Sequence, residues 1–318
     1  MEIKGILVTV LAPFDNHIAN GGEKLLGNAS SIKRRPDGRV YISGQMQRHV
    51  LFSAIDRLNT ADENNKILLK DEDGKEEKVA TFVSNGDGVS NFIEKDLRAD
   101  IGGFMHPSKG DYSGRRTAPL SVTPAVAINE SEVGRDLLVR LRFDESENAK
   151  DQALATKEFS EHDIMYMNFF LDISALSISK AFKYQNDFNI ETKYYKHASD
   201  AERKRRAKLY LEATKSMNDY ANQARNAVCG EPQKVLIVFD TVLSRKACRY
   251  FIAGEQEKKN ILEELEDSGA KYFIGDDTAE NSVYKAYKEA LEFLDSNTLY
   301  DPSNNADIKT FEQAFGCE

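Results

Sequence analysis

Residues 39–57 place a short strand directly before an amphipathic helix, and the other motifs of the chain are arranged around this junction. Val40–Ile42 is β-prone, Ser43 has the side chain of a helix N-cap, and Gly44 permits a sharp turn into the helix. Apolar residues then recur at helical spacing at Met46, Val50, Phe52 and Ile55. The pattern predicts a strand, a cap and a helix that continues to about Leu58.

The start of this predicted helix collects groups that suit a phosphate. A helix N-terminus offers free N–H groups and a partial positive charge, and the first turns carry Gln45, Gln47, Arg48 and His49. A second cationic run, Lys33–Arg35, lies just upstream, with Asp37-Gly38 as a turn between the two. By itself the helix start favours a junction with solvated polar side chains. The second cationic run is what favours an anion site.

The charge balance excludes a protein coated with positive charge. The 318 residues include 43 Lys and Arg against 52 Asp and Glu, for a net charge of −9. A nucleic-acid partner would therefore need a focused basic groove. No apolar run approaches membrane-spanning length, and the alternating N-terminus predicts a strand and not a signal peptide. Three cysteines without metal spacing, Cys229, Cys248 and Cys317, fit a cytoplasmic protein.

Periodicity and turn residues predict the remaining elements. We expect strands at Lys4–Ala12, Thr117–Ile128 (interrupted by prolines), Asp136–Phe143, Ile164–Ile173 and Lys234–Val242, and a hairpin that turns at Asp73-Gly74. We expect helices at Asn91–Ile101, at Asp200 to about Val228 with Ser199 as its cap, at Glu255–Gly269 and at Thr278–Asp295. Phe14–Ser31 and Phe104–Gly114 are predicted loops, and Asp144–Phe159 is a predicted polar arm.

This order of elements predicts an α+β fold. Strand, helix, two strands, helix and strand, with insertions, is the ferredoxin-like or RNA-recognition-motif plan. The alternative, a doubly wound parallel sheet, needs more alternation of strands and helices than the sequence offers.

Catalytic motifs are weak in this sequence. It contains no phosphate-binding loop, no dinucleotide-binding glycine motif and no zinc-protease motif. His17, His49, His106 and His162 could act as acids or bases on RNA, but each lacks a partner at a fixed short spacing. Asp172 and Asp240 end apolar strands, where a pair could hold a divalent metal and where each could equally cap a turn. Arg203–Arg206 predicts a solvated helix face that pairs with acids of this chain or of a neighbouring subunit.

The N-terminal motifs together resemble a known family. They comprise Gly27-Asn28, Lys33-Arg34, Asp37-Gly38, Ile42–Gln45, Arg48-His49, Ile101–Phe104 and Arg115–Ala127. From Met1 to about Leu176, the chain resembles the DevR-type backbone subunit of the type I (I-B-like) CRISPR Cascade complex, the "Cas seven" branch of the RAMP superfamily. The C-terminal third is similar only in the order of its helix and strand.

The resemblance implies a ferredoxin-like, RRM-like palm at 1–58 and 115–250, a helical fingers insertion at 59–114, a β-hairpin thumb at 144–163 and a C-terminal helical region at 251–318. It implies a non-catalytic CRISPR RNA-binding subunit, without cofactor or metal, that oligomerises along the guide RNA beside other Cascade subunits. The guide would then pair with target DNA. Matching and adjacent positions would contact RNA through Asn28, Lys33, Arg34, Arg35, Ser43, Gly44, Gln45, Gln47, Arg48 and His49, with further phosphate contacts from Arg115 and Arg116.

Two departures from related proteins bear on this expectation. The aromatic signature of ordinary RNA-recognition motifs is absent, so base stacking on the sheet face is not supported. The glycine-rich C-terminal loop of RAMP nucleases is also absent, which argues against the alternative of an endoribonuclease that processes CRISPR transcripts. A third hypothesis is a domain that binds a small molecule or a protein.

Overall fold

The computed structural model describes residues 1–25, 29–70, 75–85, 90–104, 112–144 and 149–316. Its helices are α1 (Gly44–Ala61), α2 (Leu97–Gly102), α3 (Asp200–Lys215), the 3-10 helix η1 (Lys246–Ile252), α4 (Glu255–Asp267), α5 (Val283–Ser296) and α6 (Phe311–Phe315). Its longer strands are β2 (Gly5–His17), β6 (Lys66–Lys70), β7 (Glu76–Ala80), β11 (Val133–Asp144), β12 (Ala149–Asp172), β13 (Ile178–Gln185), β14 (Phe188–Lys196), β15 (Lys234–Asp240) and β16 (Lys271–Asp276). Its shorter strands are β1 (Glu2–Ile3), β3 (Glu23–Lys24), β4 (Ala29–Ser31), β5 (Tyr41–Ile42), β8 (Tyr112–Arg115), β9 (Leu120–Val122), β10 (Ala125–Ala127) and β17 (Thr298–Leu299).

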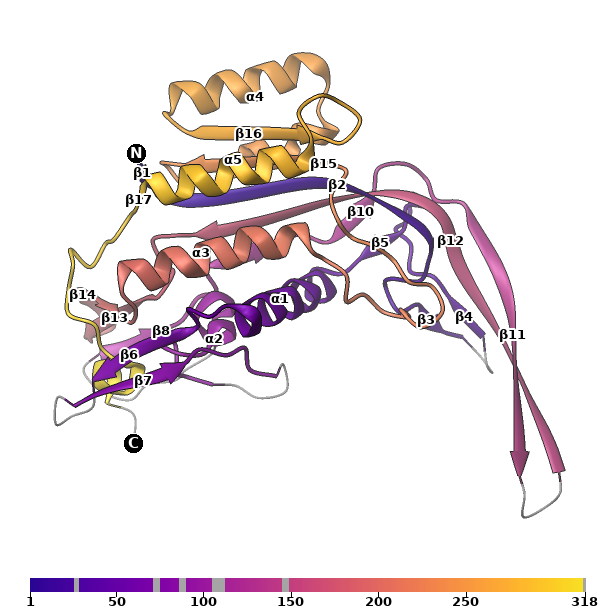
Figure 1. The fold of residues 1–318 in the computed structure, drawn as a ribbon, viewed down its shortest axis with the longest axis horizontal. Coiled ribbons are helices and arrows are strands. Elements are labelled where there is room, and N and C mark those ends of the chain that lie inside the picture. Colours follow the sequence, from indigo (N-terminus) through magenta and orange to yellow (C-terminus); the bar gives the residue numbers. More distant parts are fainter. Residues whose placement is uncertain (26–28, 71–74, 86–89, 105–111, 145–148, 317–318) are drawn as a thin grey trace.

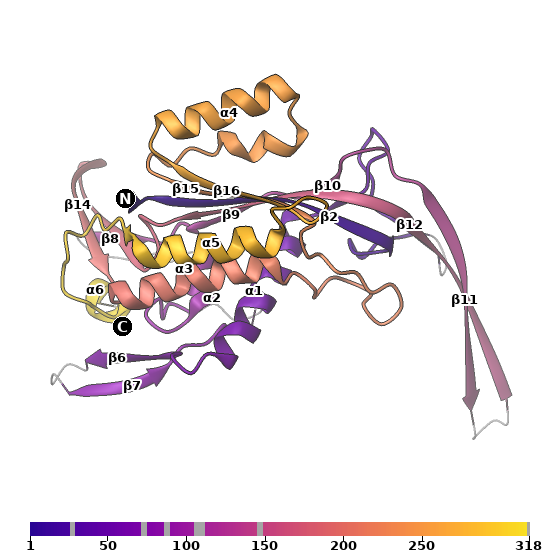
Figure 2. The ribbon, with the colours of Figure 1, turned by 45° about the horizontal axis from the view of Figure 1, so that its top comes forward.

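The protein is a mixed α+β fold built on one large sheet. Its strand order is β16-β15-β2-β12-β10-β5, with β9 also paired to β12. The pairs among β16, β15, β2, β12 and β10 are all antiparallel. Helices α1, α3 and α5 cover one face of the sheet and α4 lies over the other (Figures 1 and 2).

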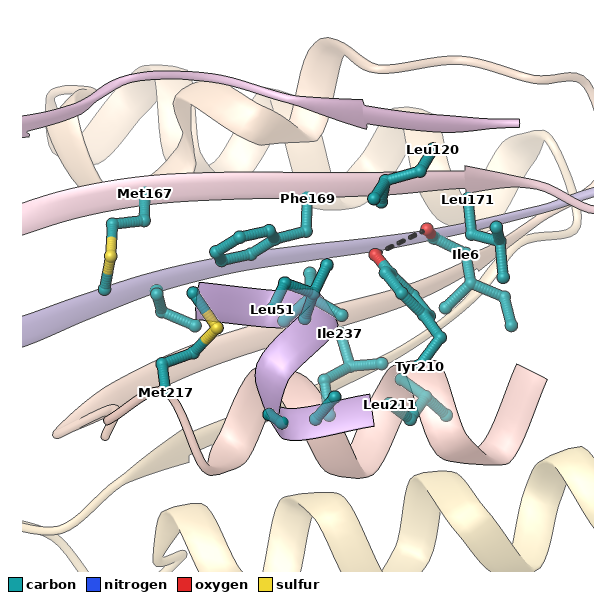
Figure 3. Close-up of a cluster of buried hydrophobic side chains, with 14 of the residues drawn as sticks. Ile6, Leu51, Leu120, Met167, Phe169, Leu171, Tyr210, Leu211, Met217 and Ile237 are labelled. Atoms are coloured by element: carbon teal, nitrogen blue, oxygen red, sulfur yellow. Dashed lines mark hydrogen bonds between the residues drawn. The ribbon is translucent and has the colours of Figure 1, made fainter. Parts of the chain in front are cut away.

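The main core fills the space between the sheet and helices α1, α3 and α5. Phe169 and Met167 project from β12 toward Leu51 of α1 and Leu211 of α3, and Tyr210 donates a hydrogen bond to the carbonyl of Ile6 (Figure 3). A smaller cluster on the opposite face packs alternate residues of the same strands under η1 and α4. Burial on both faces explains why β2 and β15 are nearly continuous apolar runs.

Strand β2 is longer than the sequence predicts. The expected end at Pro13 is wrong, because Pro13 lies inside the strand opposite Ile164 of β12. On its other side β2 pairs with β15 only as far as Leu11. Beyond Leu11 the strand has an open edge there, and proline, which has no N–H to donate, is tolerated at such an edge. Part of the predicted loop Phe14–Ser31 therefore extends the sheet.

Capping residues start α1 and α3 where the sequence predicts them, and a third capping residue starts α2 later than predicted. Ser43 and Ser199 accept hydrogen bonds from the backbone N–H groups of Met46 and Glu202 and start α1 and α3. Helix α2 is shorter than predicted, because Asp96 caps it at Leu97, and it ends as expected at Gly103 with φ 66°. The prediction that α3 continues to Val228 is wrong: it ends at Lys215, and the following segment returns to β15 without a helix.

Two hairpins extend from this body. Strands β6 and β7 pair as predicted, and the turn at Asp73-Gly74 lies outside the described residues. Strands β11 and β12 pair from Val133↔Ser160 to Asp144↔Ala149, and this hairpin, hereafter the arm, projects far from the sheet (Figures 1 and 2). The predicted arm at Asp144–Phe159 is therefore the outer and returning half of a longer hairpin.

The C-terminal part differs from the sequence prediction in one respect. The helices α4 and α5 are confirmed, but the antiparallel edge strand β16 between them was not predicted. Its sequence, Lys-Tyr-Phe-Ile-Gly-Asp, is short and carries only three apolar residues. Within the described residues, no helix has the length and apolar character that a bilayer crossing requires.

Candidate nucleic-acid interface

The cationic run Lys33–Arg35 forms one side of a tight hairpin. The N–H of Arg35 donates to the carbonyl of Arg39 at 2.9 Å, and the N–H of Gly38 donates to the carbonyl of Arg35 at 3.0 Å. Gly38 has φ 80°, a conformation that glycine adopts without strain, so the predicted turn at Asp37-Gly38 is confirmed. The Arg34 side chain is exposed and those of Lys33 and Arg35 are half-exposed.

Asn20 connects this hairpin to the strand before α1. Its side-chain nitrogen donates to the carbonyls of Lys33 and Tyr41, each at 3.0 Å. The strand β5 then pairs with β10, with Ile42 opposite Ala125. These contacts hold the cationic hairpin beside the entry to α1.

The start of α1 is partly open to solvent. Ser43 and Gln45 are exposed, and the Ser43 hydroxyl accepts from the N–H of Met46 at 3.2 Å. Gly44 packs against the backbone of the loop after β9: a Cβ there would lie 3.3 Å from the carbonyl oxygen of Val122. Gly44 is therefore needed for close packing and offers no side chain to a ligand.

In the next turn of α1, some of the predicted RNA-binding side chains are buried and others are exposed. The Gln47 side chain is fully buried and accepts a hydrogen bond from the Tyr220 hydroxyl at 3.1 Å, so the structure gives it an internal role instead of an RNA contact. The Arg48 guanidinium donates to the carbonyl of Gly102 and lies 5.5 Å from the centre of the Phe52 ring. His49 is exposed, and its Nε2 lies 3.6 Å from the carboxylate of Asp219.

Arg116 lies inside the protein, which corrects its prediction as a phosphate contact. It is 5% exposed, forms an ion pair with Asp100, and donates to the carbonyls of Ala175 and Ile178 at 2.8 and 2.7 Å. Burial leaves it no surface on which to meet a phosphate. Arg115 lies in β8 opposite Lys180, and Asn28 lies outside the described residues.

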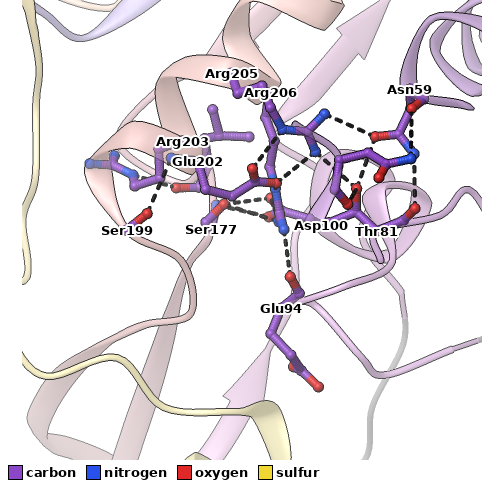
Figure 4. A network of polar contacts seen from close by, with 12 residues as sticks. Asn59, Thr81, Glu94, Asp100, Ser177, Ser199, Glu202, Arg203, Arg205 and Arg206 are labelled. Atoms are coloured by element: carbon purple, nitrogen blue, oxygen red, sulfur yellow. Dashed lines mark hydrogen bonds and ion pairs between the residues drawn. The ribbon is translucent and has the colours of Figure 1, made fainter. Parts of the chain in front are cut away.

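The run Arg203–Arg206, predicted to be solvated, lies largely inside the protein. Four consecutive residues point to different sides of a helix, so they cannot all face solvent when the helix packs against the body. Arg203 and Arg206, three positions apart on one face of α3, are fully buried. Arg206 contacts Asp100 at 2.6 Å and Glu202 at 2.7 Å (Figure 4). Arg205 reaches Asp62 at 3.0 Å. The expected pairing with acids is confirmed, and the acids belong to this chain.

The resulting network joins Thr81 and the segment 93–100 to α3. Besides its ion pairs, Arg206 donates to the carbonyls of Ile93 and Glu94 at 2.9 and 2.5 Å. Burial raises the pKa of Asp100, but the guanidinium groups of Arg116 and Arg206 outweigh it and hold that pKa below its usual value. In the sequence, the three-residue spacing that puts Arg203 and Arg206 on one helix face is the feature that corresponds to this buried face.

The candidate histidines that lie among the described residues do not converge on one site. His17 is buried, with its Nε2 2.8 Å from Asp163, and Asp163 also accepts from the Ser131 hydroxyl at 2.5 Å. Burial raises the pKa of Asp163, but these hydrogen bonds outweigh it and lower the pKa. His162 is exposed and pairs with Asp15, whereas His106 lies outside the described residues. The group around His17 is buried at the base of the arm, without access to a substrate.

The two strand-end aspartates cap turns. Asp172 and Asp240 both stand opposite Gly5, on the strands that flank β2. Asp172 accepts from the N–H of Ser174 at 2.9 Å, and Asp240 accepts from the N–H of Ser244 at 2.8 Å. Among the described residues, no group of three or more His, Cys, Asp or Glu side chains is arranged to hold a metal ion. The hydrogen bonds to Ser174 and Ser244 confirm the capping interpretation of these two residues.

The base of the arm lies next to the cationic hairpin. Strand β4, just before Lys33, pairs in parallel with β12 at Thr156 and Lys157. The N–H of Ile32 donates to Glu158 at 3.3 Å, and Glu158 also accepts from Arg135 at 3.1 Å. These contacts place Lys33–Arg35 where the arm leaves the body.

The arm carries an apolar face that the described chain does not cover. Leu137, Val139 and Leu154 are 65%, 51% and 50% exposed. The register pairs Val139 with Leu154 and Leu137 with Thr156, so the three apolar side chains share one face. Exposed apolar residues at neighbouring positions indicate a contact surface.

Comparisons with known proteins identify a family and a shared fold. The family described as CRISPR-associated negative auto-regulator DevR/Csa2 matches residues 19–229. A chain of a CRISPR RNA-guided surveillance complex superposes with a TM-score of 0.54 at 14% identity, over 91% of this chain and 99% of that chain. A chain of a complex described as CRISPR RNA-guided surveillance complex, pre-nicking, gives 0.52 at 12% identity, over 93% and 96%. No curated protein matches.

At these identities the structural neighbours establish a shared fold over nearly the whole length of both chains. The family match covers well over half of the sequence, including the cationic hairpin, α1, the arm and α3. This chain belongs to the DevR/Csa2 family of CRISPR-associated proteins.

Proposed function

We propose that this protein is a non-catalytic backbone subunit of a type I CRISPR surveillance complex, which binds CRISPR RNA and assembles along it. The observation that carries the proposal is the position of Lys33–Arg35. This cationic run meets the open start of α1 at the base of an arm whose apolar face is uncovered. The printed names of the structural neighbours, which are RNA-guided surveillance complexes, support it.

The sheet supports the assignment of a ferredoxin-like palm. In chain order, β2, α1, β9 and β10, β12, α3 and β15 follow the strand–helix–strand–strand–helix–strand plan. Their order in space, β15-β2-β12-β10, is antiparallel throughout. We assign the fingers to 59–114, which includes β6, β7 and α2, and the thumb to the arm.

In this proposal the protein holds the RNA by its phosphates. Arg34 is exposed and the neighbouring lysine and arginine are half-exposed, so these cations can meet a passing backbone. Ser43, Gln45 and His49 lie exposed on the first turns of α1, where hydrogen-bond donors and the helix dipole favour an anion. Because these contacts involve the phosphates, the bases of the RNA remain available for pairing with target DNA.

The arm would extend along the RNA to a neighbouring copy. An isolated two-stranded hairpin is marginally stable in water, and this one exposes Leu137, Val139 and Leu154. Contact with RNA and a second subunit would bury these side chains. Other Cascade subunits would be further partners in the same complex.

The test is the salt dependence of binding to single-stranded CRISPR RNA. Each phosphate contact contributes about −0.7 to the slope of log K against log salt, so K33A/R34A/R35A should reduce the slope by about 2 and weaken binding. The matched control K259A/K285A/K288A removes three cations from α4 and α5 and should bind as the parent does. If the first variant binds with the parent's affinity and slope, the interface is misplaced.

The non-catalytic part of the proposal has its own test. Incubation with repeat RNA, with and without magnesium, should leave the RNA intact. Defined cleavage products would favour the RAMP-type endoribonuclease instead.

A further inference from the structure

A second basic surface lies at the other end of α1. A groove of about 770 Å³ runs between the β6–β7 hairpin and α3. Its charged lining comprises Lys66, Lys70, Lys78, Lys204, Arg205 and Lys208, with Glu202 as the one acid in that lining. We call this surface the lysine groove.

The lysine groove has unpaired charge and exposed apolar surface together. Lys66 and Lys78 are exposed and have no carboxylate of the described chain within ion-pair distance. Leu68 and Ile308, which also line the groove, are 62% and 46% exposed. Neither feature is satisfied within the described chain, so the groove suits a partner that is both acidic and able to cover apolar side chains.

Helix α4 offers such a partner. Its buried residues are Ile261 and Leu265, so the helical period directs Glu263 and Asp267 away from the body. Both are exposed, and neither lies within ion-pair distance of a cation of the described chain. Residues 255–267 contain six acids and two lysines, which complements the groove.

The two surfaces lie on opposite sides of the molecule. Both views place α4 beyond one face of the sheet and β6–β7 on the other side, below α3 (Figures 1 and 2). Different, complementary surfaces on opposite sides generate head-to-tail assemblies and not closed dimers. In both views the arm descends on the same side of the sheet as β6–β7 but at the opposite end of the molecule, so a copy displaced toward that side would lie under both the arm and the groove.

We propose that the lysine groove of one copy receives the acidic outer face of α4 from the next copy. This rests on the proposed assembly and adds the surfaces that set its direction and spacing. RNA is a poorer occupant of the groove, because the groove is far from the RNA-binding residues of the proposed function. The 18 residues of α1 span about 27 Å between Ser43 and the start of the groove. The groove is thus a site distinct from the cationic hairpin.

Charge reversal on each surface tests this pairing. K66E/K78E and E263K/D267K should each weaken assembly on long RNA about tenfold or more, measured by sedimentation velocity, because like charges then meet. An equimolar mixture of the two variants should regain assembly, since each then presents the charge the other needs. The control K285E/K288E on α5 should assemble as the parent does.

Binding to an RNA long enough for one copy separates this inference from the proposed function. Both reversed variants should bind it with parental affinity and melt at the parental temperature. If either variant assembles normally, or if the mixture fails to recover, the pairing is wrong while RNA binding stands. If K66E/K78E loses affinity for the short RNA, the groove is an RNA site and the pairing is likewise wrong.

Discussion

Asp100 is the residue on which the junction between α2 and α3 depends. Its carboxylate is fully buried, pairs with Arg116 and Arg206, and accepts from the hydroxyl of Ser177 at 2.7 Å. In the variant D100N the charge is lost, and an amide N–H₂ replaces one acceptor facing guanidinium donors. Of the two buried cations, Arg206 would keep its ion pair with Glu202, whereas Arg116 would keep only its hydrogen bonds to backbone carbonyls.

The expected cost follows from this burial. Removing one partner of a buried ion pair costs about 3–5 kcal/mol, because the remaining charge stays desolvated. For a chain of this size the loss should lower the melting temperature by on the order of 10 °C. Urea is the suitable denaturant, because it does not screen the ion pairs.

The matched control is D295N. Asp295 pairs with Lys208 on the surface, at side-chain exposures of 52% and 36%, and an exposed pair contributes about 0–1 kcal/mol. Circular dichroism against urea, with the parent and both variants at one pH, gives the comparison. A cost below about 1 kcal/mol for D100N would show that the network is not what holds α2 and the segment 93–100 to α3.

Three further predictions concern single features of the chain. Burial lowers the pKa of His197 to about 4, below the value of about 6.5 expected when unfolded. As the pH drops, the unfolded chain therefore takes up this proton first, and the stability of the protein should fall between about pH 6.5 and pH 4. The variant H197N can still donate a hydrogen bond to the Lys309 carbonyl, and thermal melts across this pH window should show a smaller loss of stability. An unchanged loss of stability would refute this role of His197. In urea unfolding, S43A should lower the free energy of unfolding by about 1 kcal/mol and S43G by only a few tenths, because alanine cannot cap α1. Equal losses for the two variants would contradict the capping role of Ser43. L137S/V139S changes exposed side chains, so it should leave the melting temperature unchanged but weaken assembly on RNA. Normal assembly in sedimentation would show that the apolar face of the arm does not contact a neighbouring subunit.

Much of the local structure could be predicted because its causes lie close together in the sequence. Ser43 caps α1 through an N–H three residues away, and Gly38 closes a turn within its own hairpin. The family could also be identified, since its motifs lie in short segments between Gly27 and Ala127.

The exposure of the candidate site residues could not be predicted in the same way. Arg34 and Gln47 belong to equally polar segments, yet the first is exposed and the second is buried against Tyr220, 173 positions away. Arg116 adjoins another arginine in a motif that resembles a phosphate contact, and its partner proved to be Asp100 inside the protein.

The sequence by itself determined the caps of α1 and α3, the turn at Asp37-Gly38, most of the apolar strands and the family, because each depends on residues a few positions apart. Only the tertiary structure decided which cations face solvent, where α3 ends, and that Pro13 continues a strand. Those outcomes depend on neighbours brought from distant segments: Asp100 meets Arg206 across 106 positions, and His17 meets Asp163 across 146. A charged side chain is stable inside only where the fold supplies its partner, and the sequence does not show which distant residue that will be.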